Sequence, residues 1–213
     1  METRMSEIVS RKNEHIKIGM IPGHFATNHS HVNCYVDMDS VKCRFKIAKE
    51  AARVISSEYV STPVDTIICL EGTRVLGALI AEQLSENYSH SVNDGRDICV
   101  ITPELDSNRQ MIFRDNTQKM VWNKQVLLLI SSASTGRTIE RSIECLKYYS
   151  GKLAAVTAIF SAIDEAGGGI AVHSLFTAED LPGYFTLPSA ECPMCREKQK
   201  VDAIINEHGY SKI

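Results

Sequence analysis

Short hydrophobic runs alternate along this chain with segments whose apolar residues recur at helical spacing. Each run is short enough for a buried strand, and each periodic segment predicts a helix with one apolar face. The predicted strands cover residues 32–38, 66–70, 97–102, 126–130, 153–160 and 171–175. The predicted helices cover residues 5–18, 42–59, 75–84 and 198–207, with one more that follows the turn at 131–137 and ends at Tyr149. Residues 19–30 are predicted to form a loop, and the polar residues 106–123 a mobile hairpin.

Strands that alternate with helices are typical of an α/β fold, in which a parallel twisted sheet is flanked by helices on both faces. At 213 residues the chain is long enough for one domain with a modest appendage. Ligands of such sheets bind beyond the carboxyl ends of the strands. Three turns lie at those ends, at residues 69–74, 102–106 and 131–137.

The turn after residues 126–130 has the pattern of an anion site. A buried strand leads into a turn of small hydroxyl residues, and a helix follows. The first backbone N–H groups of a helix lack intrahelical partners, and the helix dipole adds partial positive charge there. We therefore expect a phosphate at this turn, although a merely polar strand-to-helix turn is the alternative. The candidate phosphate-binding residues are Ser131, Ser132, Ser134, Thr135, Gly136, Arg137 and Thr138.

Charge and cysteine content narrow the class of protein. The formal net charge of -3 gives no electrostatic argument for a nucleic acid or an anionic membrane as partner. No apolar run approaches the length of a membrane span, and the N-terminus lacks the apolar stretch of a signal peptide. Of the seven cysteines, Cys69, Cys99 and Cys145 lie inside apolar runs. Buried thiols of this kind suit a reducing compartment, so we expect a cytoplasmic protein.

The order of these parts resembles the type I phosphoribosyltransferases, and within them the orotate phosphoribosyltransferase branch. The resemblance covers roughly residues 15–197. It rests on four motifs. They are STGRT at 134–138 after the strand VLLLI, CLEGTRVLGALIAEQL at 69–84, GHF at 23–25 with HS and Tyr35 downstream, and CPMC at 192–195.

The resemblance implies an enzyme of nucleotide metabolism that transfers phosphoribosyl from phosphoribosyl pyrophosphate (PRPP) to a nucleobase. It also implies a homodimer. It implies a phosphoribosyltransferase-like domain over residues 1–187, with an N-terminal hood over about residues 1–40, and a C-terminal tail over 188–213. STGRT would hold the 5′-phosphate of PRPP. The pyrophosphate loop would consist of Glu71, Gly72, Thr73 and Arg74. The mobile segment 106–124 would supply catalytic cations, for which the candidates are Arg109, Arg114 and Lys119.

The chain also departs from the family pattern. The two adjacent acids that begin the family's phosphate loop are replaced by Ile130 and Ser131, or by Ser131 and Ser132. Mg²⁺ is therefore a doubtful cofactor, unless Glu71 replaces the missing acids; its alternative role is to favour a helix N-terminus.

A second departure concerns the base. Where the orotate branch carries an arginine for the substrate carboxylate, this chain has Asp164 and Glu165, so we expect orotate to be a poor substrate. The alternative function is a non-catalytic, regulatory protein that binds phosphate or a nucleotide on the same fold.

Cys192 and Cys195 have the spacing of metal ligands, but one pair supplies only two. His208 is the nearest further candidate in the sequence. A structural or idle pair is the expectation, with no metal ligands assigned, and zinc binding and a redox pair are the alternatives. Three histidines lie in or directly after the predicted loop: His24, His29 and His31. We expect them to be surface residues, and stacking on a base is the alternative.

Overall fold

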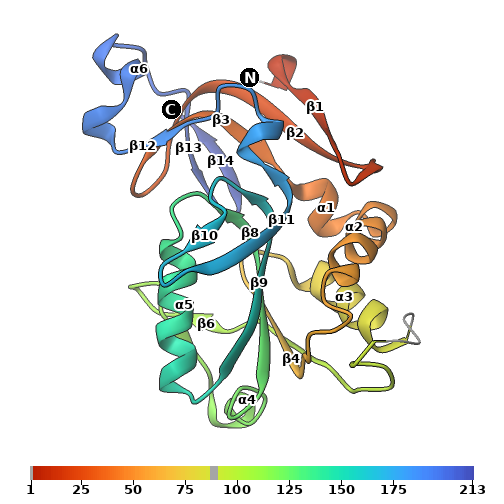
Figure 1. Ribbon diagram of the computed structural model, residues 1–213. Coiled ribbons are helices and arrows are strands. Elements are labelled where there is room, and N and C mark those ends of the chain that lie inside the picture. The colour runs from red at the N-terminus through yellow and green to blue at the C-terminus, as the bar shows by residue number, and fades with distance from the viewer. Residues whose placement is uncertain (1, 87–90) are drawn as a thin grey trace.

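A six-stranded sheet forms the centre of the molecule (Figure 1). The computed structural model describes residues 2–86 and 91–213. Five of the strands are parallel, and the short strand β10 pairs antiparallel with β11 at one edge. In spatial order the strands are β10 (Glu165–Ala166), β11 (Ile170–Thr177), β9 (Lys152–Ser161), β8 (Gln125–Ala133), β4 (Thr66–Cys69) and β5 (Cys99–Ile101). The predicted α/β fold with a parallel sheet is confirmed.

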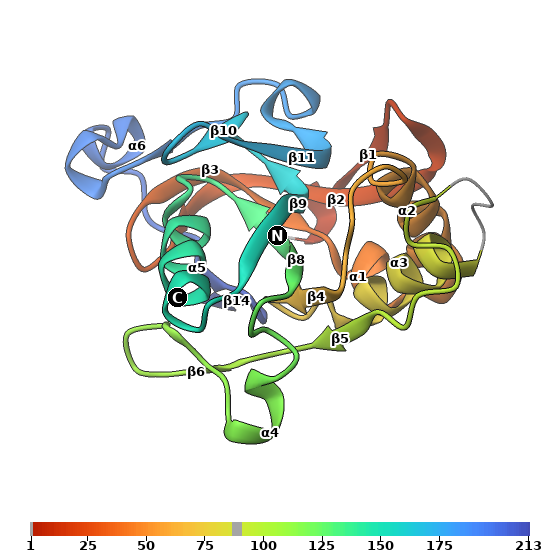
Figure 2. The same cartoon turned by 60° about the horizontal axis from the view of Figure 1, so that its bottom comes forward.

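Helices cover both faces of this sheet. Helices α1 (Asp39–Cys43), α2 (Phe45–Ser57) and α3 (Arg74–Glu86) lie on one side, and α5 (Arg137–Tyr148) lies on the other (Figure 2). The short helix α4 (Asp115–Gln118) follows a small hairpin of β6 (Glu104–Leu105) and β7 (Met111–Ile112). Among the helices of the described residues, none is long and apolar enough to cross a membrane.

A second sheet lies above the carboxyl ends of the central strands, and we call it the hood sheet (Figure 1). Its strands come from both ends of the chain, so the N-terminal and C-terminal segments fold together. They are β1 (Ser6–Ser10), β2 (Asn13–Ala26), β3 (His31–Asp37), β12 (Thr186–Leu187), β13 (Ala203–Asn206) and β14 (Gly209–Lys212). The remaining elements are α6 (Pro193–Arg196) and single 3₁₀ turns at Glu2–Arg4, Ala178–Asp180 and Ser189–Glu191.

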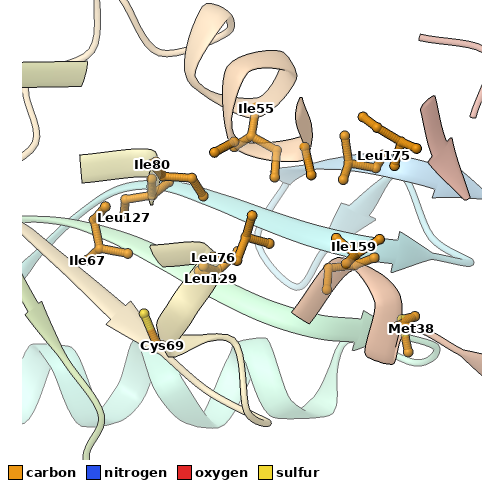
Figure 3. Packing of buried hydrophobic residues seen from close by; sticks show 14 of the residues in the cluster. Met38, Ile55, Ile67, Cys69, Leu76, Ile80, Leu127, Leu129, Ile159 and Leu175 are labelled. Atoms are coloured by element: carbon orange, nitrogen blue, oxygen red, sulfur yellow. The ribbon is translucent and has the colours of Figure 1, made fainter. Parts of the chain in front are cut away.

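The main core fills the space between the central sheet and helices α2 and α3 (Figure 3). Ile67, Leu127 and Leu129 of the sheet pack with Leu76 and Ile80 of α3, and all five are fully buried. Apolar burial of this kind is the main source of stability in a folded domain. This packing holds β4 and β8 side by side, and the candidate site lies beyond their carboxyl ends.

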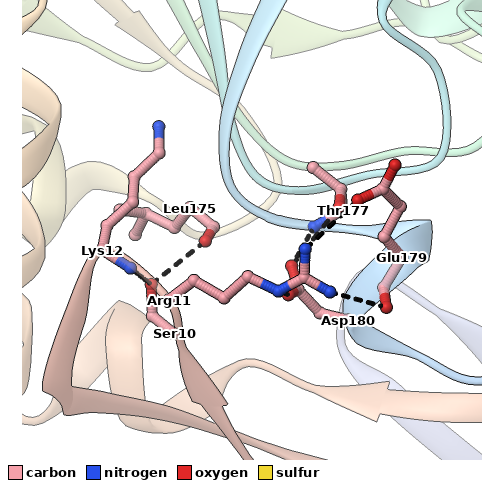
Figure 4. A network of polar contacts seen from close by, with 7 residues as sticks. All are labelled: Ser10, Arg11, Lys12, Leu175, Thr177, Glu179 and Asp180. Atoms are coloured by element: carbon pink, nitrogen blue, oxygen red, sulfur yellow. Dashed lines mark hydrogen bonds and ion pairs between the residues drawn. The ribbon is translucent and has the colours of Figure 1, made fainter.

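A polar network joins the hood sheet to the end of β11 (Figure 4). In the turn between β1 and β2, the guanidinium of Arg11 pairs with Asp180, whose side chain is 8% exposed. The carboxylate of Asp180 also accepts the backbone N–H of Thr177 at 2.8 Å. Ser10 donates its hydroxyl to the carbonyl of Leu175 at 3.2 Å. These contacts hold the hood hairpin against the central sheet.

Two predicted helices are wrong. Residues 5–18 form β1 and the start of β2, because buried Ile16 and Ile18 alternate with exposed Lys17, which is the period of a strand. The predicted loop at 19–30 is mostly the continuation of β2 to Ala26. Residues 198–207 contain β13 rather than a helix, since its backbone pairs in parallel with β2. In both cases pairing with a distant strand decided the local structure.

The other predicted elements are confirmed, with ends shifted by a few residues. The strands at 32–38, 66–70, 97–102, 126–130, 153–160 and 171–175 correspond to β3, β4, β5, β8, β9 and β11. The helix predicted at 42–59 is divided into α1 and α2, whose boundary is the extended residue Arg44. Residues 106–123 contain the β6–β7 turn and α4, so the predicted hairpin accounts for only part of that segment.

We expect Leu127→Ala to lower the free energy of unfolding by about 2–5 kcal/mol, because it leaves a cavity in the core beneath β8. Chemical denaturation measures this loss. Val75→Ala, on the 48% exposed side chain of α3, is the control and should change stability by about 0.5 kcal/mol or less. A loss under about 1 kcal/mol for Leu127→Ala would contradict the assigned core.

Candidate active site

The central sheet reverses its strand order between β4 and β8. From β4 the chain moves outward to β5, and it then returns to the other side of β4 to form β8. At such a reversal, the loops after the two strands run in opposite directions and leave a crevice between them. Open α/β sheets bind their ligands in this crevice. The loops after β4 and β8, residues 70–73 and 134–136, meet at this point.

A cavity of about 250 Å³ lies at this reversal, between the central sheet and the hood sheet. Its floor comes from the loops after β4 and β8 and from the first turns of α5, and its roof from β3 and the β13–β14 hairpin. Tyr35 of β3 lines it, and desolvation raises the pKa of Tyr35 to about 12. The phenol therefore keeps its proton at neutral pH and can donate a hydrogen bond to a ligand.

The structure brings most of the predicted phosphate-binding residues to the cavity. Its lining includes Ser131, Ser132, Ser134, Thr135, Arg137 and Thr138. Gly136 lies beneath the turn as the N-cap of α5, with φ +76°. A Cβ atom there would stand 3.1 Å from Cδ1 of Ile163. The left-handed backbone thus favours glycine, and an added side chain would press on Ile163.

Glu71 connects the loop after β4 to the end of β8. Its Oε2 accepts the backbone N–H of Ser131 at 3.1 Å, the hydroxyl of Ser131 at 2.6 Å and the backbone N–H of Ser132 at 3.1 Å. The Glu71 backbone has φ +55°, which is unusual for a residue other than glycine. A carboxylate with several N–H donors forms strong charge-assisted hydrogen bonds. Glu71 therefore places a carboxylate beside Ser131 and Ser132.

The other residues of the predicted pyrophosphate loop have different surroundings. Gly72 has φ +80° and allows the turn. Thr73 is fully buried and donates its hydroxyl to the carbonyl of Leu70 at 2.7 Å, which is a structural role. Arg74 begins α3 with an exposed side chain, and among the described residues it is not part of the cavity lining. Of the four, Glu71 alone lines the cavity in this part of the structure.

The structure places the three predicted catalytic cations in three different surroundings. Arg109 lines the cavity, and its guanidinium binds Glu207 of the β13–β14 turn at 2.6 Å. Desolvation raises the pKa of Glu207, but the hydrogen bond and charge of Arg109 outweigh it and hold that pKa below its usual value. Arg114 pairs with Glu104 across the small hairpin, and both side chains are more than half exposed. Lys119 lies beside Trp122 and Tyr148, in a surface depression away from the cavity.

Several cavity residues were missed by the sequence reasoning. Lys42 of α1 has a side chain only 13% exposed, and its Cδ lies 3.8 Å from where a Cβ of Gly72 would be. Arg141 follows Arg137 by one helical turn, so α5 presents both guanidinium groups to the cavity. The i, i+4 spacing of these arginines was visible in the sequence, whereas nothing local marked Lys42.

Asp164 and Glu165 do not stand at the site. Glu165 begins the edge strand β10, and Asp164 directly precedes it; both are exposed, and neither is part of the cavity lining among the described residues. The carbonyl of Asp164 accepts the backbone N–H of Val172, which holds β10 against β11. The prediction that these acids face the base therefore finds no support in the cavity lining, because this segment forms the antiparallel edge strand β10.

A scan against models of protein families finds no match for this sequence, and a search of the curated proteins finds none either. Solved structures do resemble it. The UMP synthase of Leishmania donovani aligns with a TM-score of 0.55 at 14% identity, over 76% of this chain and 34% of that one, so this chain spans about a third of its length. The adenine phosphoribosyltransferase of Thermoanaerobacter pseudethanolicus aligns with a TM-score of 0.50 at 15% identity, over 83% and 96% of the two chains.

The orotate phosphoribosyltransferase of Mycobacterium tuberculosis H37Rv, solved in complex with PRPP, aligns with a TM-score of 0.50 at 14% identity. The alignment covers 69% of this chain and 82% of that one. At such identities the likeness concerns the fold. The chain has the type I phosphoribosyltransferase fold, as its motifs indicated, and its candidate site lies at the strand reversal of that fold.

We expect Glu71→Gln to lower the free energy of unfolding by about 1–3 kcal/mol, since a neutral amide oxygen accepts three hydrogen bonds less strongly than a carboxylate. Urea denaturation measures the loss. Glu144→Gln, on the exposed face of α5, removes the same charge without these partners and serves as the control. Equal stability of the two variants would show that Glu71 does not hold the turn.

Proposed function

We propose that this protein is a phosphoribosyltransferase that binds PRPP, or another phosphorylated ribose, and transfers the phosphoribosyl group to a neutral nucleobase. The observation that carries the proposal is the cavity at the strand reversal, with the 134–138 turn and two arginines of α5 on its wall. The fold is that of enzymes acting on orotate and adenine. A homodimer and a cytoplasmic location are part of the proposal by the same likeness.

The 5′-phosphate would occupy the turn at Ser134–Thr138. The hydroxyls of Ser134, Thr135 and Thr138 line the cavity at the start of α5. Backbone N–H groups of a first helical turn point outward, and the dipole of the helix favours an anion there. Arg137 and Arg141 add two permanent charges on the same side. Their guanidinium groups can bind phosphate oxygens in a bidentate manner.

The reaction would separate charge at the anomeric carbon, with positive charge on the ribose and negative charge on the departing pyrophosphate. Preorganised cations stabilise such a leaving group. Lys42 is well placed for this role, since its side chain is largely buried in the wall of the cavity beside the 70–73 loop. Arg109 would contribute only after its ion pair with Glu207 opens. Arg114 and Lys119 have no part in this proposal.

The hood end of the cavity suits an uncharged base. Asn28, Tyr35 and Asn206 line it and offer neutral hydrogen-bonding groups. Arg109 reaches the same region, but its charge is balanced by Glu207 at 2.6 Å. The carboxylate of orotate would have to displace Glu207 or remain unpaired, and an unpaired buried carboxylate costs several kcal/mol. Orotate is accordingly a poor candidate, although for a different reason than Asp164 and Glu165.

Mg²⁺ fits this cavity badly. The ion requires oxygen ligands in a regular octahedron, and it usually binds through one or two carboxylates with substrate phosphates. Around the cavity, the described carboxylates are Glu71 and Glu207. The first already accepts three hydrogen bonds, and the second pairs with Arg109. We therefore derive no catalytic step that depends on Mg²⁺.

One observation favours the second candidate function, a regulatory protein that binds a nucleotide without turnover. Glu71, the carboxylate beside Ser131 and Ser132, is engaged by those residues themselves. A group held in this way would bind the ribose hydroxyls of PRPP only if a ligand displaced it. Phosphate binding at 134–138 would be unaffected, so binding and turnover separate the two functions.

We expect Gly136→Ala to weaken binding of ribose 5-phosphate at least tenfold, or about 1.4 kcal/mol. The new Cβ would press on Ile163 and displace the turn, as measured by calorimetry. Gly95→Ala is the matched control, because Gly95 has φ +68° with no described atom within 4 Å of an added Cβ. It should suffer the same backbone strain and keep its affinity. Unchanged affinity in both variants would remove the phosphate site from this turn.

Turnover with PRPP tests the proposal as a whole. We expect activity with a neutral base such as uracil or adenine, and kcat/KM for orotate lower by about 100-fold or more, equivalent to about 2.7 kcal/mol. Addition of Mg²⁺ should change PRPP affinity by less than about tenfold. An ordinary micromolar KM for orotate, or a larger gain with Mg²⁺, would contradict the assigned roles of Glu207 and Glu71. If every base fails while PRPP binds, the regulatory function is correct.

A further inference from the structure

Four potential metal ligands from distant parts of the chain meet beside the hood sheet. They are His24 of β2, His31 of β3, and Cys192 and Cys195 of the C-terminal tail. Their ligand atoms all lie within 4.8 Å of one another. His24 and Cys192 are buried, at 2% and 0% exposure, and the other two are half-buried. We call this group the four-residue cluster.

The atoms that face each other in the four-residue cluster are those that would bind a metal. Nε2 of His24 lies 2.8 Å from Nδ1 of His31, 3.6 Å from Sγ of Cys192 and 3.7 Å from Sγ of Cys195. Nδ1 of His31 lies 3.2 Å from Sγ of Cys195. A tetrahedral ion with metal–sulfur bonds of about 2.3 Å and metal–nitrogen bonds of about 2.0 Å separates nitrogen from sulfur by about 3.5 Å. The cluster has nearly these dimensions.

The surroundings orient His24 for this role. Its Nδ1 lies 3.0 Å from the carbonyl of Gln199, which can only accept, so Nδ1 carries the proton. In this tautomer Nε2 carries the free lone pair of the ring, and it faces the two sulfurs. Hydrogen bonding of the remote imidazole nitrogen to a backbone carbonyl is the usual support of a metal-binding histidine. The backbone N–H of His24 also donates to Asp202 at 2.9 Å.

The two cysteines form a compact turn that points both sulfurs at the histidines. Pro193 starts α6 directly after Cys192, and the carbonyl of Cys192 accepts the backbone N–H of Arg196. One helical turn places residues i and i+3 on the same face. The pair supplies two ligands, and the cysteine spacing alone could not indicate the other two, because these lie more than 160 residues earlier.

We propose that the four-residue cluster is a structural zinc site with a Cys₂His₂ ligand set. Four protein ligands close a tetrahedral site, which distinguishes a structural site from a catalytic one. Two thiolates with two imidazoles match zinc better than Mg²⁺ or Ca²⁺, which prefer oxygen. His208 is not a ligand: its side chain is 85% exposed in the turn between β13 and β14. This proposal replaces the expectation from the sequence that Cys192 and Cys195 form a structural or idle pair.

The ion would fasten the C-terminal tail to the hood sheet. His24 and His31 lie on either side of the β2–β3 turn, and Asn28 and His29 of that turn line the cavity. The tail continues into β13, which pairs with β2 at Phe25 and Ala26. Binding energy of a structural zinc ion contributes directly to folding. The site therefore stabilises the roof of the cavity, but its existence does not depend on the proposed function.

The test is made on the full chain, purified under reducing conditions with ZnSO₄ in the medium. We expect about one zinc per chain by elemental mass spectrometry, the content of one closed tetrahedral site. Exchange with Co²⁺ should give the intense visible bands of tetrahedral cobalt and a near-ultraviolet thiolate charge-transfer band. A folded protein with less than about a tenth of an equivalent of metal would overturn the proposal. So would a Cys192–Cys195 disulfide, seen as a loss of two hydrogens in mass.

Two variants identify the ligands. Cys195→Ser and His31→Asn should lose zinc at least tenfold and lower the melting temperature. Cys43→Ser and His208→Asn are the controls, since Cys43 and His208 are exposed and lie outside the four-residue cluster. If a ligand variant fails to fold, the cobalt spectrum of the unmodified chain still decides the ligand type. Full zinc content in both folded ligand variants, or a cobalt spectrum without the thiolate band, would overturn the assignment.

Discussion

The hydrogen bonds from the last residues of β8 to Glu71 are the contact on which the candidate site depends. They join the carboxyl ends of β4 and β8 at the point where the strand order of the sheet reverses. The carboxylate occupies the backbone N–H groups of Ser131 and Ser132, so the unsatisfied groups at the start of α5 are left for a ligand. The same contact holds the end of β8 beside the 70–73 loop, with one carboxylate shared by three donors.

The fold class could be predicted because the hydrophobic pattern of the central strands is local and strong. The runs around Ile67, Leu128 and Val156 are buried on both faces, which is typical of a parallel sheet. The 134–138 turn was predictable for a related reason: a strand, a small-residue turn and a helix follow one another without interruption. Gly136 shows how specific that signal was, since its left-handed backbone favours glycine and leaves little room beside Ile163.

The remaining features depend on contacts between distant segments, which no local pattern carries. Residues 5–18 have apolar positions that suit a helix or a strand, and pairing of β1 with β2 decides the matter. Arg109 lines the cavity, but its ion pair with Glu207 comes from the C-terminal hairpin, which the sequence did not indicate. The four-residue cluster is the extreme case, because its histidines and cysteines stand at opposite ends of the sequence. The hood sheet brings them together by pairing both ends of the chain.

Amide chemical shifts during titration with ribose 5-phosphate test the central claim most directly. The account predicts large shifts for the backbone N–H groups of Thr135–Thr138, which have no acceptor outside α5 among the described residues. It predicts small shifts for Ser131 and Ser132, because Glu71 already accepts their hydrogen bonds. Large shifts at Ser131 and Ser132, with none at Thr135–Thr138, would contradict both the phosphate site and the role of Glu71.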